Sequence, residues 1–326
     1  MLLLSLSARS KLLRLITMLQ RPTPRPQPLR PRRCQLSVPG SSEKMLAKAA
    51  DLAVDGIVLD LEDAVAPNAK AQAREFVIDA LNNLQWQAKV ISVRINGTNT
   101  PWCHDDVIHL LTQAGDKVST LVLAKTNQVA DVHFLHLLLD QLEQKLGLAN
   151  RVGIEGLIED VSGLINVEDI AAASDRLESL IFGMGDYSAS QHMRLDAIGS
   201  SGDYPPDIWH YPRYKLITAC HAHGLDPIDG PYAIFNDLET LQTEATHGAT
   251  LGMFGKWAIH PSQTEILQTT FAPSSEAVLA ARQQKNAFES AVAEGQGAIS
   301  VDGVMVDAAS IRLVQNLLDR AELYGL

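Results

Sequence analysis

The chain contains the stretch Val152-Gly-Ile-Glu-Gly-Leu-Ile-Glu159, an apolar run that ends in a carboxylate. A second run of this kind follows it, Leu180-Ile-Phe-Gly-Met-Gly-Asp186. Largely apolar runs of this length are typical of strands that are buried on both faces of a parallel sheet. In a (β/α)8 barrel the carboxyl ends of such strands meet at one mouth and carry the chemistry. The two acids are therefore expected to lie near each other at such a mouth.

The same pattern recurs along the chain. Short apolar runs alternate with longer amphipathic stretches, as expected for repeated strand–helix units around a parallel sheet. Eight runs predict strands: Gln35–Val38, Gly56–Leu61, Val90–Ile95, Thr120–Ala124, Val152–Ile158, Leu177–Phe182, Leu225–Ile228 and Gly252–Ile259. We therefore predict an α/β fold, a (β/α)8 TIM barrel that closes near residue 260.

Capping residues indicate where helices begin. Ser42, Asn68 and Asp237 precede predicted helices over 44–53, 69–84 and 238–246. Beyond residue 271 further elements are predicted: a helix over 276–293, the segment 299–307 and a last helix over 309–323. The barrel does not need this C-terminal helical extension to close. We expect the extension to pack on a neighbouring subunit or to cover the mouth.

Three parts are predicted: a basic, Pro-rich tail (1–33), a TIM-barrel catalytic domain (34–270) and the extension (271–326). The first 42 residues contain eight Lys or Arg and no Asp or Glu, which leaves a net charge near −19 on the remainder. The Leu-rich, acid-free start is compatible with a mitochondrial transit peptide, with a true start at Met18, or with a disordered tail. We expect a cytoplasmic protein, with the mitochondrial matrix as the alternative.

Composition excludes several functions. The acidic body is unsuited to nucleic acid, because phosphate contacts need clustered Lys and Arg. Charged residues interrupt the Leu-rich start too often for a membrane span. Cys34, Cys103 and Cys220 are widely spaced, which argues against a disulfide framework or a zinc site. The sequence also lacks the motifs of dinucleotide-binding folds, P-loops, zinc proteases and serine hydrolases.

Glu159 and Asp186 are candidate metal ligands. They follow two consecutive predicted strands, so their carboxylates are expected within several ångströms of each other. Two carboxylates without a partnering His or Cys suit a hard cation such as Mg²⁺, which keeps several waters. The alternative is that they are two solvated loop acids.

Arg94 ends a predicted strand, where its guanidinium group must find an anion. A substrate carboxylate or a developing enolate is one partner. A buried ion pair with a core acid such as Glu62 or Asp63 is the alternative. Those two acids could instead orient waters on the metal.

Lys44 and Lys48 lie four residues apart on one face of the first predicted helix. They could bind phosphates at the barrel rim. On spacing alone, ordinary solvated lysines are the favoured interpretation.

A series of short motifs, in order, resembles the citrate lyase β-subunit-like family of acyl-CoA lyases in the HpcH/HpaI aldolase superfamily. The motifs are Leu36-Ser-Val-Pro-Gly40, Leu59-Asp-Leu-Glu-Asp-Ala-Val65, Val93-Arg-Ile-Asn96, Ile158-Glu159, Phe182-Gly-Met-Gly-Asp186, Ile228-Asp229, Gly255-Lys-Trp-Ala-Ile-His-Pro261, Phe271-Ala-Pro-Ser274 and Asp302-Gly-Val-Met-Val-Asp307. The resemblance implies a Mg²⁺-dependent TIM barrel, with Mn²⁺ as a possible substitute, that forms a homotrimer or homohexamer. It implies an acyl-CoA substrate and a small keto acid as partners.

The resemblance also implies roles for individual residues. Glu159 and Asp186 match the metal ligands, and Arg94 matches the arginine that holds the keto-acid end. Lys44 and Lys48 match lysines that contact coenzyme A, which reverses the interpretation from their spacing.

Further matches concern the thioester and the extension. Ile228 and Asp229 match contacts near the thioester, and Ser37 stands where relatives often have an aromatic residue against the coenzyme. Asp307 matches an aspartate that is donated to the active site across a subunit boundary. Ala124 precedes Lys125 where relatives frequently have proline.

These matches predict a reversible Claisen-type retro-aldol cleavage in which the metal and Arg94 stabilise negative charge and Asp307 protonates the enolate carbon. We expect citramalyl-CoA as substrate, giving acetyl-CoA and pyruvate, because Gly183, Gly185 and Ala258 leave room for a methyl group. The alternatives are a malyl-CoA/β-methylmalyl-CoA lyase that releases glyoxylate, a malyl-CoA thioesterase, a citrate lyase β subunit and a non-catalytic coenzyme A-binding module.

Overall fold

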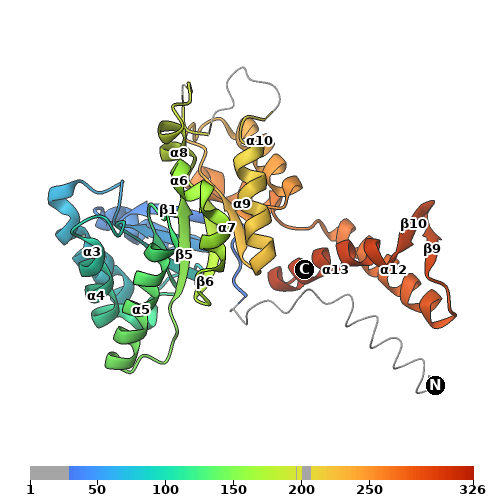
Figure 1. Cartoon of the computed structure of the whole chain (residues 1–326), viewed down its shortest axis with the longest axis horizontal. Coiled ribbons are helices and arrows are strands. Elements are labelled where there is room, and N and C mark those ends of the chain that lie inside the picture. Colours follow the sequence, from blue (N-terminus) through green and yellow to red (C-terminus); the bar gives the residue numbers. More distant parts are fainter. Residues whose placement is uncertain (1–28, 196, 200–206) are drawn as a thin grey trace. The chain divides into compact units, whose positions relative to one another are not determined.

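The computed structural model describes residues 29–195, 197–199 and 207–326. Eight parallel strands form a closed barrel in chain order, in which β1 also pairs with β8. Figure 1 shows β1, β5 and β6 of this barrel together with helices that surround it. The strands are β1 (Cys34–Pro39), β2 (Gly56–Asp60), β3 (Val90–Ile95), β4 (Thr120–Leu123), β5 (Gly153–Ile158), β6 (Leu177–Phe182), β7 (Asp226–Asp229) and β8 (Gly255–Ala258). Each overlaps its predicted run, so the predicted barrel is confirmed.

Helices connect the strands. They are α2 (Glu43–Ala50), α3 (Lys70–Asn83), α4 (Cys103–Ala114), α5 (Val129–Leu146), α6 (Val161–Ile165), α7 (Val167–Ala172), α8 (Met184–Ser190), α9 (His210–His223), α10 (Leu238–Leu251) and α11 (Thr264–Thr270). Ser42 and Asp237 cap α2 and α10 through their side chains, as predicted. Asn68 does not cap α3, because Pro67 starts a 3₁₀ turn that contains it.

Apolar side chains fill two layers. Successive residues of a strand point to opposite faces, so Val58 of β2 lies inside the barrel, whereas Ile57 and Leu59 join the larger cluster between strands and helices. The inner cluster consists of Val58, Val122, Leu157, Ile181, Ile228 and Trp257. Burial of each such side chain contributes about 1.5–3 kcal/mol to the stability of the barrel.

A polar layer lies below the inner cluster, toward the amino-terminal ends of the strands. Its centre is Glu155 of β5, which is fully buried. The carboxylate of Glu155 accepts hydrogen bonds from Gln35, Ser92, Thr120 and Ser179, which lie on four other strands or strand starts. This end of the barrel is therefore closed by a buried carboxylate and the side chains that donate to it.

The barrel unit begins at Arg30, four residues before the predicted boundary. Arg32 is 2% exposed and bonds to Glu178 and to Asp226, with 2.7 Å between its Nη1 and Oδ2 of Asp226. Its Nε lies 3.6 Å from Oε2 of Glu155, and Arg30 also bonds Glu178. These arginines neutralise buried carboxylates, which is why they belong to the barrel and not to the tail. The other predictions for the tail concern residues 1–28, outside the described residues.

The extension, Ala272–Leu326, forms a second compact unit. It consists of α12 (Ser275–Ala293), the antiparallel pair β9 (Ala298–Val301) and β10 (Val304–Asp307), and α13 (Ala308–Tyr324). Asp302 and Gly303 join the two strands with φ values of 49° and 80°, the left-handed conformations that a two-residue type I′ turn requires. Its buried cluster is small: Phe288, Val306 and Ile311.

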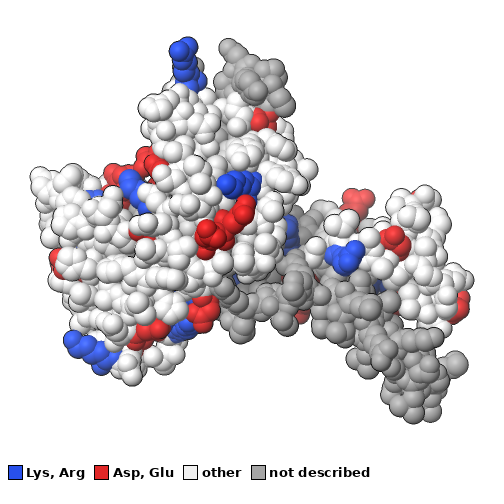
Figure 2. All heavy atoms as spheres, in the orientation of Figure 1, with Lys and Arg blue, Asp and Glu red and all other residues white. Residues whose placement is uncertain are grey.

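On the face drawn in Figure 2, Lys and Arg are scattered among acidic side chains and form no continuous basic patch on the described residues. In the same described ranges, no helix is long and apolar enough to span a membrane.

Candidate active site

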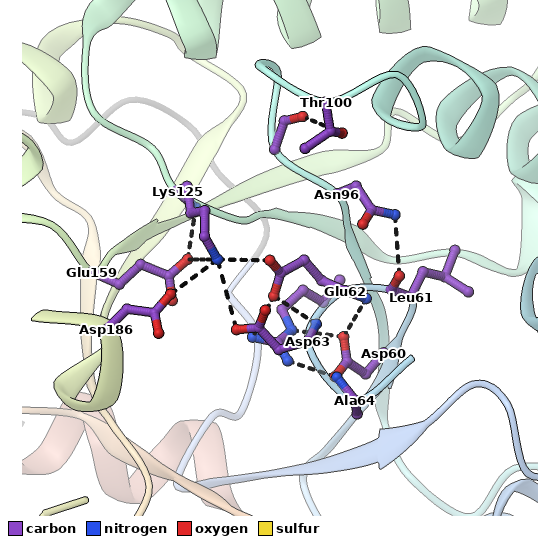
Figure 3. Close-up of polar contacts among 12 residues, drawn as sticks. Asp60, Leu61, Glu62, Asp63, Ala64, Asn96, Thr100, Lys125, Glu159 and Asp186 are labelled. Atoms are coloured by element: carbon purple, nitrogen blue, oxygen red, sulfur yellow. Dashed lines mark hydrogen bonds and ion pairs between the residues drawn. The ribbon is translucent and has the colours of Figure 1, made fainter. Parts of the chain in front are cut away.

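Four loops bring charged side chains together at the carboxyl ends of the strands. Glu62 and Asp63 follow β2, Lys125 follows β4, Glu159 follows β5, and Asp186 lies in the first turn of α8 after β6. Figure 3 shows the Lys125 ammonium group between two pairs of acids, Glu159 with Asp186 and Glu62 with Asp63. The predicted convergence of acids at one mouth is thus present in the structure.

The side chain of Glu159 is closely packed against the backbone at Gly183. A side chain at Gly183 would put its Cβ 2.4 Å from Cβ of Glu159, so glycine is required where β6 leads into α8. Glu159 is 5% exposed, and one hydrogen bond reaches its carboxylate from the described residues, from the backbone N–H of Lys125 at 2.7 Å. Burial raises the pKa of Glu159 to about 8, although Lys125 and Arg94 oppose the shift. Its hydrogen bond and the neighbouring cations therefore do not offset the cost of burying the ionised carboxylate.

Lys125 is the central cation of the site. Its Nζ lies 2.7 Å from Oε1 of Glu62, 3.0 Å from Oδ2 of Asp186, 3.7 Å from Oδ2 of Asp63 and 4.0 Å from Oε1 of Glu159. These acids raise the pKa of Lys125 above its ordinary value, against the effect of burial. Its backbone has φ 52°, a left-handed conformation that is uncommon for residues other than glycine and often occurs at functional sites.

Arg94 makes the buried ion pair that was one of its two predicted roles, with the predicted Glu62 and, more closely, with Asp60. Asp60, which is fully buried, accepts two hydrogen bonds from Arg94, at 2.7 Å from Nε and 2.5 Å from Nη2. The remaining Nη1 lies 3.3 Å from Oε2 of Glu62, and the guanidinium group stands 5.5 Å from the ring centroid of Trp257. The pair fixes Arg94, so that Nη1 is the nitrogen directed at the acids of the mouth.

A second group of residues supports the loop after β2. Lys70 of α3 donates to the carbonyl oxygens of Leu61 and Glu62 at 2.9 and 2.8 Å. The side chain of Asn96 donates to the same Leu61 carbonyl (Figure 3). It also donates to Asp106. These bonds fix the backbone of the loop that carries Glu62 and Asp63. They leave the carboxylates of the two acids free for other contacts.

The acids of the mouth outnumber their paired cations. The acids are Asp60, Glu62, Asp63, Glu159 and Asp186, and they pair with Lys125 and Arg94. Carboxylate oxygens are the donors that Mg²⁺ prefers, so this set fits the metal that the resemblance implies. Within the ranges that the structure describes, no three acidic, His or Cys side chains are close enough to chelate an ion together. A cation here would need waters or substrate oxygens to complete its ligands.

The predicted coenzyme A contacts lie either on the side of the barrel that carries the mouth or deeper inside the barrel. Lys44 and Lys48 are exposed on α2, directly after β1. Ser37 of β1 is half-buried and two residues beyond Gln35, so it points to the inside of the barrel. Ile228 is fully buried in the inner cluster.

Asp229 differs from the other predicted contacts. It is fully buried and bonds to Arg213 at 2.9 Å and to Lys256 at 2.6 Å. These two cations lower its pKa, against the effect of burial. Its side chain therefore belongs to an internal ion cluster, and a contact with the thioester would have to come from its backbone.

Asp307 ends β10 and caps α13 in the extension. Its Oδ1 accepts hydrogen bonds from the backbone N–H groups of Ala309 and Ser310 and from the hydroxyl of Ser310. These bonds lower the pKa of Asp307, so its carboxylate is ionised at neutral pH, the form that a general base needs.

Comparison with known proteins identifies the family. The pattern of the HpcH/HpaI aldolase/citrate lyase family matches residues 33–261. The chain belongs to this family, and its members named below are mainly carbon–carbon lyases, so it is a lyase of that class.

Curated relatives narrow the class. The L-malyl-CoA/β-methylmalyl-CoA lyase of Cereibacter sphaeroides is 42% identical over 308 residues, which cover 91% of this chain and 97% of the relative. The malyl-CoA/β-methylmalyl-CoA/citramalyl-CoA lyase of Chloroflexus aurantiacus is 28% identical, covering 91% of this chain and 89% of the relative. A (3S)-malyl-CoA thioesterase of C. sphaeroides is 34% identical, covering 90% and 95%.

Solved structures agree with this fold. A citrate lyase from Burkholderia xenovorans matches with a TM-score of 0.78 and 26% identity, over 90% of this chain and 92% of that one. The CitE protein of Mycobacterium tuberculosis, crystallised with magnesium, acetoacetate and coenzyme A, matches with a TM-score of 0.69 and 28% identity, over 89% and 97%.

Proposed function

We propose that this protein is a Mg²⁺-dependent lyase that cleaves L-malyl-CoA to acetyl-CoA and glyoxylate and that also accepts β-methylmalyl-CoA. The observation that carries the proposal is the 42% identity, over nearly the whole chain, to a lyase with these substrates. The acid-rich mouth with its buried Arg94 supports it, because a lyase needs charge stabilisation at the reacting oxygens.

This proposal replaces the expected citramalyl-CoA cleavage, which the relatives favour less. At Gly183 and Gly185 the space beside the backbone is taken by other side chains. A Cβ on Gly183 would meet Glu159, and a Cβ on Gly185 would lie 3.0 Å from Ile198. Ala258 belongs to the outer cluster and does not face the inside of the barrel. A single methyl group on the substrate changes the discrimination between two substrates by about 1–3 kcal/mol. A preference for malyl-CoA over citramalyl-CoA is therefore large enough to measure as a ratio of kcat/KM values.

The residues have distinct roles in this proposal. Glu159 and Asp186 hold Mg²⁺, which supplies a Lewis acid for the negative charge that develops on the keto-acid oxygens. Arg94, fixed by Asp60, presents a permanent positive charge to the glyoxylate end. Lys44 and Lys48 bind the phosphates of coenzyme A from the exposed face of α2.

Asp307 supplies the proton chemistry from a neighbouring subunit of a homotrimer or homohexamer. In the condensation direction its carboxylate removes a proton from the methyl carbon of acetyl-CoA. In the cleavage direction the protonated Asp307 gives its proton to the enolate carbon, the hydroxyl proton of malyl-CoA passes to water, and water returns a proton to Asp307. The ionised state that its hydrogen bonds favour suits the first of these steps.

The test uses purified full-length protein with Mg²⁺ and malyl-CoA, and it measures glyoxylate as its phenylhydrazone and free thiol in parallel samples. We expect glyoxylate without free thiol, and loss of glyoxylate with EDTA. Free thiol without glyoxylate would establish the alternative of a malyl-CoA thioesterase, the activity by which the 34% identical relative is named. Pyruvate from citramalyl-CoA at a higher kcat/KM would restore the original expectation.

The role of Asp307 in a neighbouring subunit has its own test. Asp307→Asn and Arg94→Met are each expected to be inactive. Unfolding and refolding the two variants together should regain part of the activity, because mixed oligomers contain sites with both intact residues. No recovery in mixtures that do exchange subunits would place Asp307 in the site of its own chain.

A further inference from the structure

Lys125 has surroundings that a structural lysine does not need. Its ammonium group lies within 4.0 Å of four carboxylates, which come from the loops after β2 and β5 and from the first turn of α8. The side chain is 32% exposed, so it reaches into the mouth rather than into the core. A lysine that served the fold alone would need one acid, since each further acid adds repulsion among the acids themselves.

The ammonium group also lies where a metal ion would have to bind. Its Nζ is 3.0 Å from Asp186 and 4.0 Å from Glu159, the pair proposed to hold Mg²⁺. An ion that binds both carboxylates takes oxygen ligands at about 2.1 Å, and it would come into close contact with an ammonium group at those distances. The two cations therefore compete for the same acids.

Glu62 and Asp63 offer the ammonium group a second place. Figure 3 shows these acids on the side of Nζ opposite to Glu159 and Asp186. The nearest oxygen of all four acids is Oε1 of Glu62, at 2.7 Å. A small rotation of the flexible lysine side chain would keep this ion pair and leave Glu159 and Asp186 free.

We propose that Lys125 is the resident counter-ion of the metal site, which neutralises Glu159 and Asp186 in the metal-free protein and withdraws toward Glu62 and Asp63 when Mg²⁺ binds. Lys125 thereby sets the affinity for the metal. It is a positioning residue, because it acts on the reaction through the metal ligands. This inference rests on the proposed Mg²⁺ dependence of the enzyme.

The test measures Mg²⁺ affinity by calorimetry on EDTA-treated, dialysed full-length protein without substrate, so that it does not depend on activity. Lys125→Asn removes the charge and tolerates the left-handed backbone at φ 52°. It also keeps the backbone N–H that donates to Glu159. We expect Mg²⁺ to bind this variant about tenfold more tightly, or better, because a competing charge is gone. Lys125→Gly gives the same readout should the asparagine variant fold poorly.

Two controls separate competition from other effects. Lys125→Arg keeps the charge and should bind Mg²⁺ within about threefold of the wild type. Lys117→Asn removes an exposed positive charge just before β4, at the other end of the barrel, and should leave Mg²⁺ affinity unchanged. Thermal unfolding should show the matching pattern: without metal, Lys125→Asn melts below the wild type, and saturating Mg²⁺ raises its Tm by more.

The outcomes distinguish the two ideas. Equal or weaker Mg²⁺ binding by Lys125→Asn, while the wild type binds, would overturn the counter-ion role and leave the proposed lyase function intact. Absence of Mg²⁺ binding in the wild type and in the variant would overturn the proposed metal dependence, and the counter-ion role with it.

Discussion

Glu155 and Glu159 lie four residues apart on and just after β5, and both are buried, yet their surroundings differ. Glu155, near the amino-terminal end of the barrel, accepts four side-chain hydrogen bonds and faces Arg32. These partners lower the pKa of Glu155, against the effect of burial. Glu159, at the mouth, receives one hydrogen bond from the described residues, and burial raises its pKa to about 8.

The difference shows what each end of the barrel is built for. A buried carboxylate whose acceptor capacity is filled stabilises its ionised form and contributes to folding. A buried carboxylate that lacks such partners costs stability when ionised, and it binds a cation that arrives later all the more readily. The same residue type on one strand thus serves the fold at one end and the site at the other.

The largest expected effect is that of Glu159→Gln on activity. Loss of a metal ligand removes several kcal/mol of transition-state stabilisation, so kcat/KM for malyl-CoA cleavage should fall by about 10³-fold or more. The free energy of unfolding should not fall in metal-free protein, because a neutral amide avoids the cost of a buried charge. Glyoxylate release and urea unfolding measure the two effects. A residual activity within tenfold of the wild type would remove Glu159 from the metal site.

Glu155→Gln tests the other end of the barrel. It breaks one partner of a buried ionic cluster and should lower the free energy of unfolding by about 3 kcal/mol. The kcat/KM of the molecules that remain folded should stay within about twofold, because Glu155 does not reach the mouth. Urea unfolding with intrinsic tryptophan fluorescence gives the first quantity, and initial rates below the unfolding transition give the second. A large loss of kcat with unchanged stability would mean that the two ends do not differ in this way.

Much of the barrel could be predicted because strand burial leaves a direct pattern in the sequence. Each of the eight apolar runs overlaps one of the eight strands. Glu159 and Asp186 were identified because they follow the fifth and sixth runs, and the structure brings both to one mouth. Residues at strand ends are informative because a parallel barrel places all of these ends on one side.

The missed parts are those that depend on partners far apart in the chain. Glu155 sits inside an apolar run, and no local pattern separates it from Glu159. The sequence indicated Glu62 as a partner of Arg94 but not Asp60, because which acid faces β3 depends on the strand register. Lys125 is a single lysine after a strand, and its four acids come from other loops.

A smaller effect concerns acid pH. Because the pKa of Glu155 is lowered in the folded state, its contribution to stability is fully present above its unfolded pKa of about 4.3 and is lost as pH falls through the folded value. The difference in unfolding free energy between the wild type and Glu155→Gln should therefore shrink from pH 6 toward pH 3. Urea midpoints at intermediate pH values measure this change. A difference that stays constant with pH would show that Glu155 acts through packing and not through its charge.

The smallest effect is expected for Asp63→Asn, because Asp63 has a 56% exposed side chain 3.7 Å from Nζ of Lys125. Because Asp63 is a solvated charge, its replacement should weaken Mg²⁺ affinity by about twofold at low ionic strength. In 0.5 M KCl, where exposed charges are screened over roughly 4 Å, the replacement should have no measurable effect. Asp116→Asn, which removes a similarly exposed acid near the closed end, is the matched control.

A loss of tenfold or more in Mg²⁺ affinity that persists in high salt would give Asp63 a different role. Hydrogen bonding to metal-bound water has effects of about 10- to 100-fold and is not screened as an exposed charge is. Asp63 would then belong with Glu159 among the residues that hold the ion, and the functional end of the barrel would extend from β5 and β6 to the loop after β2.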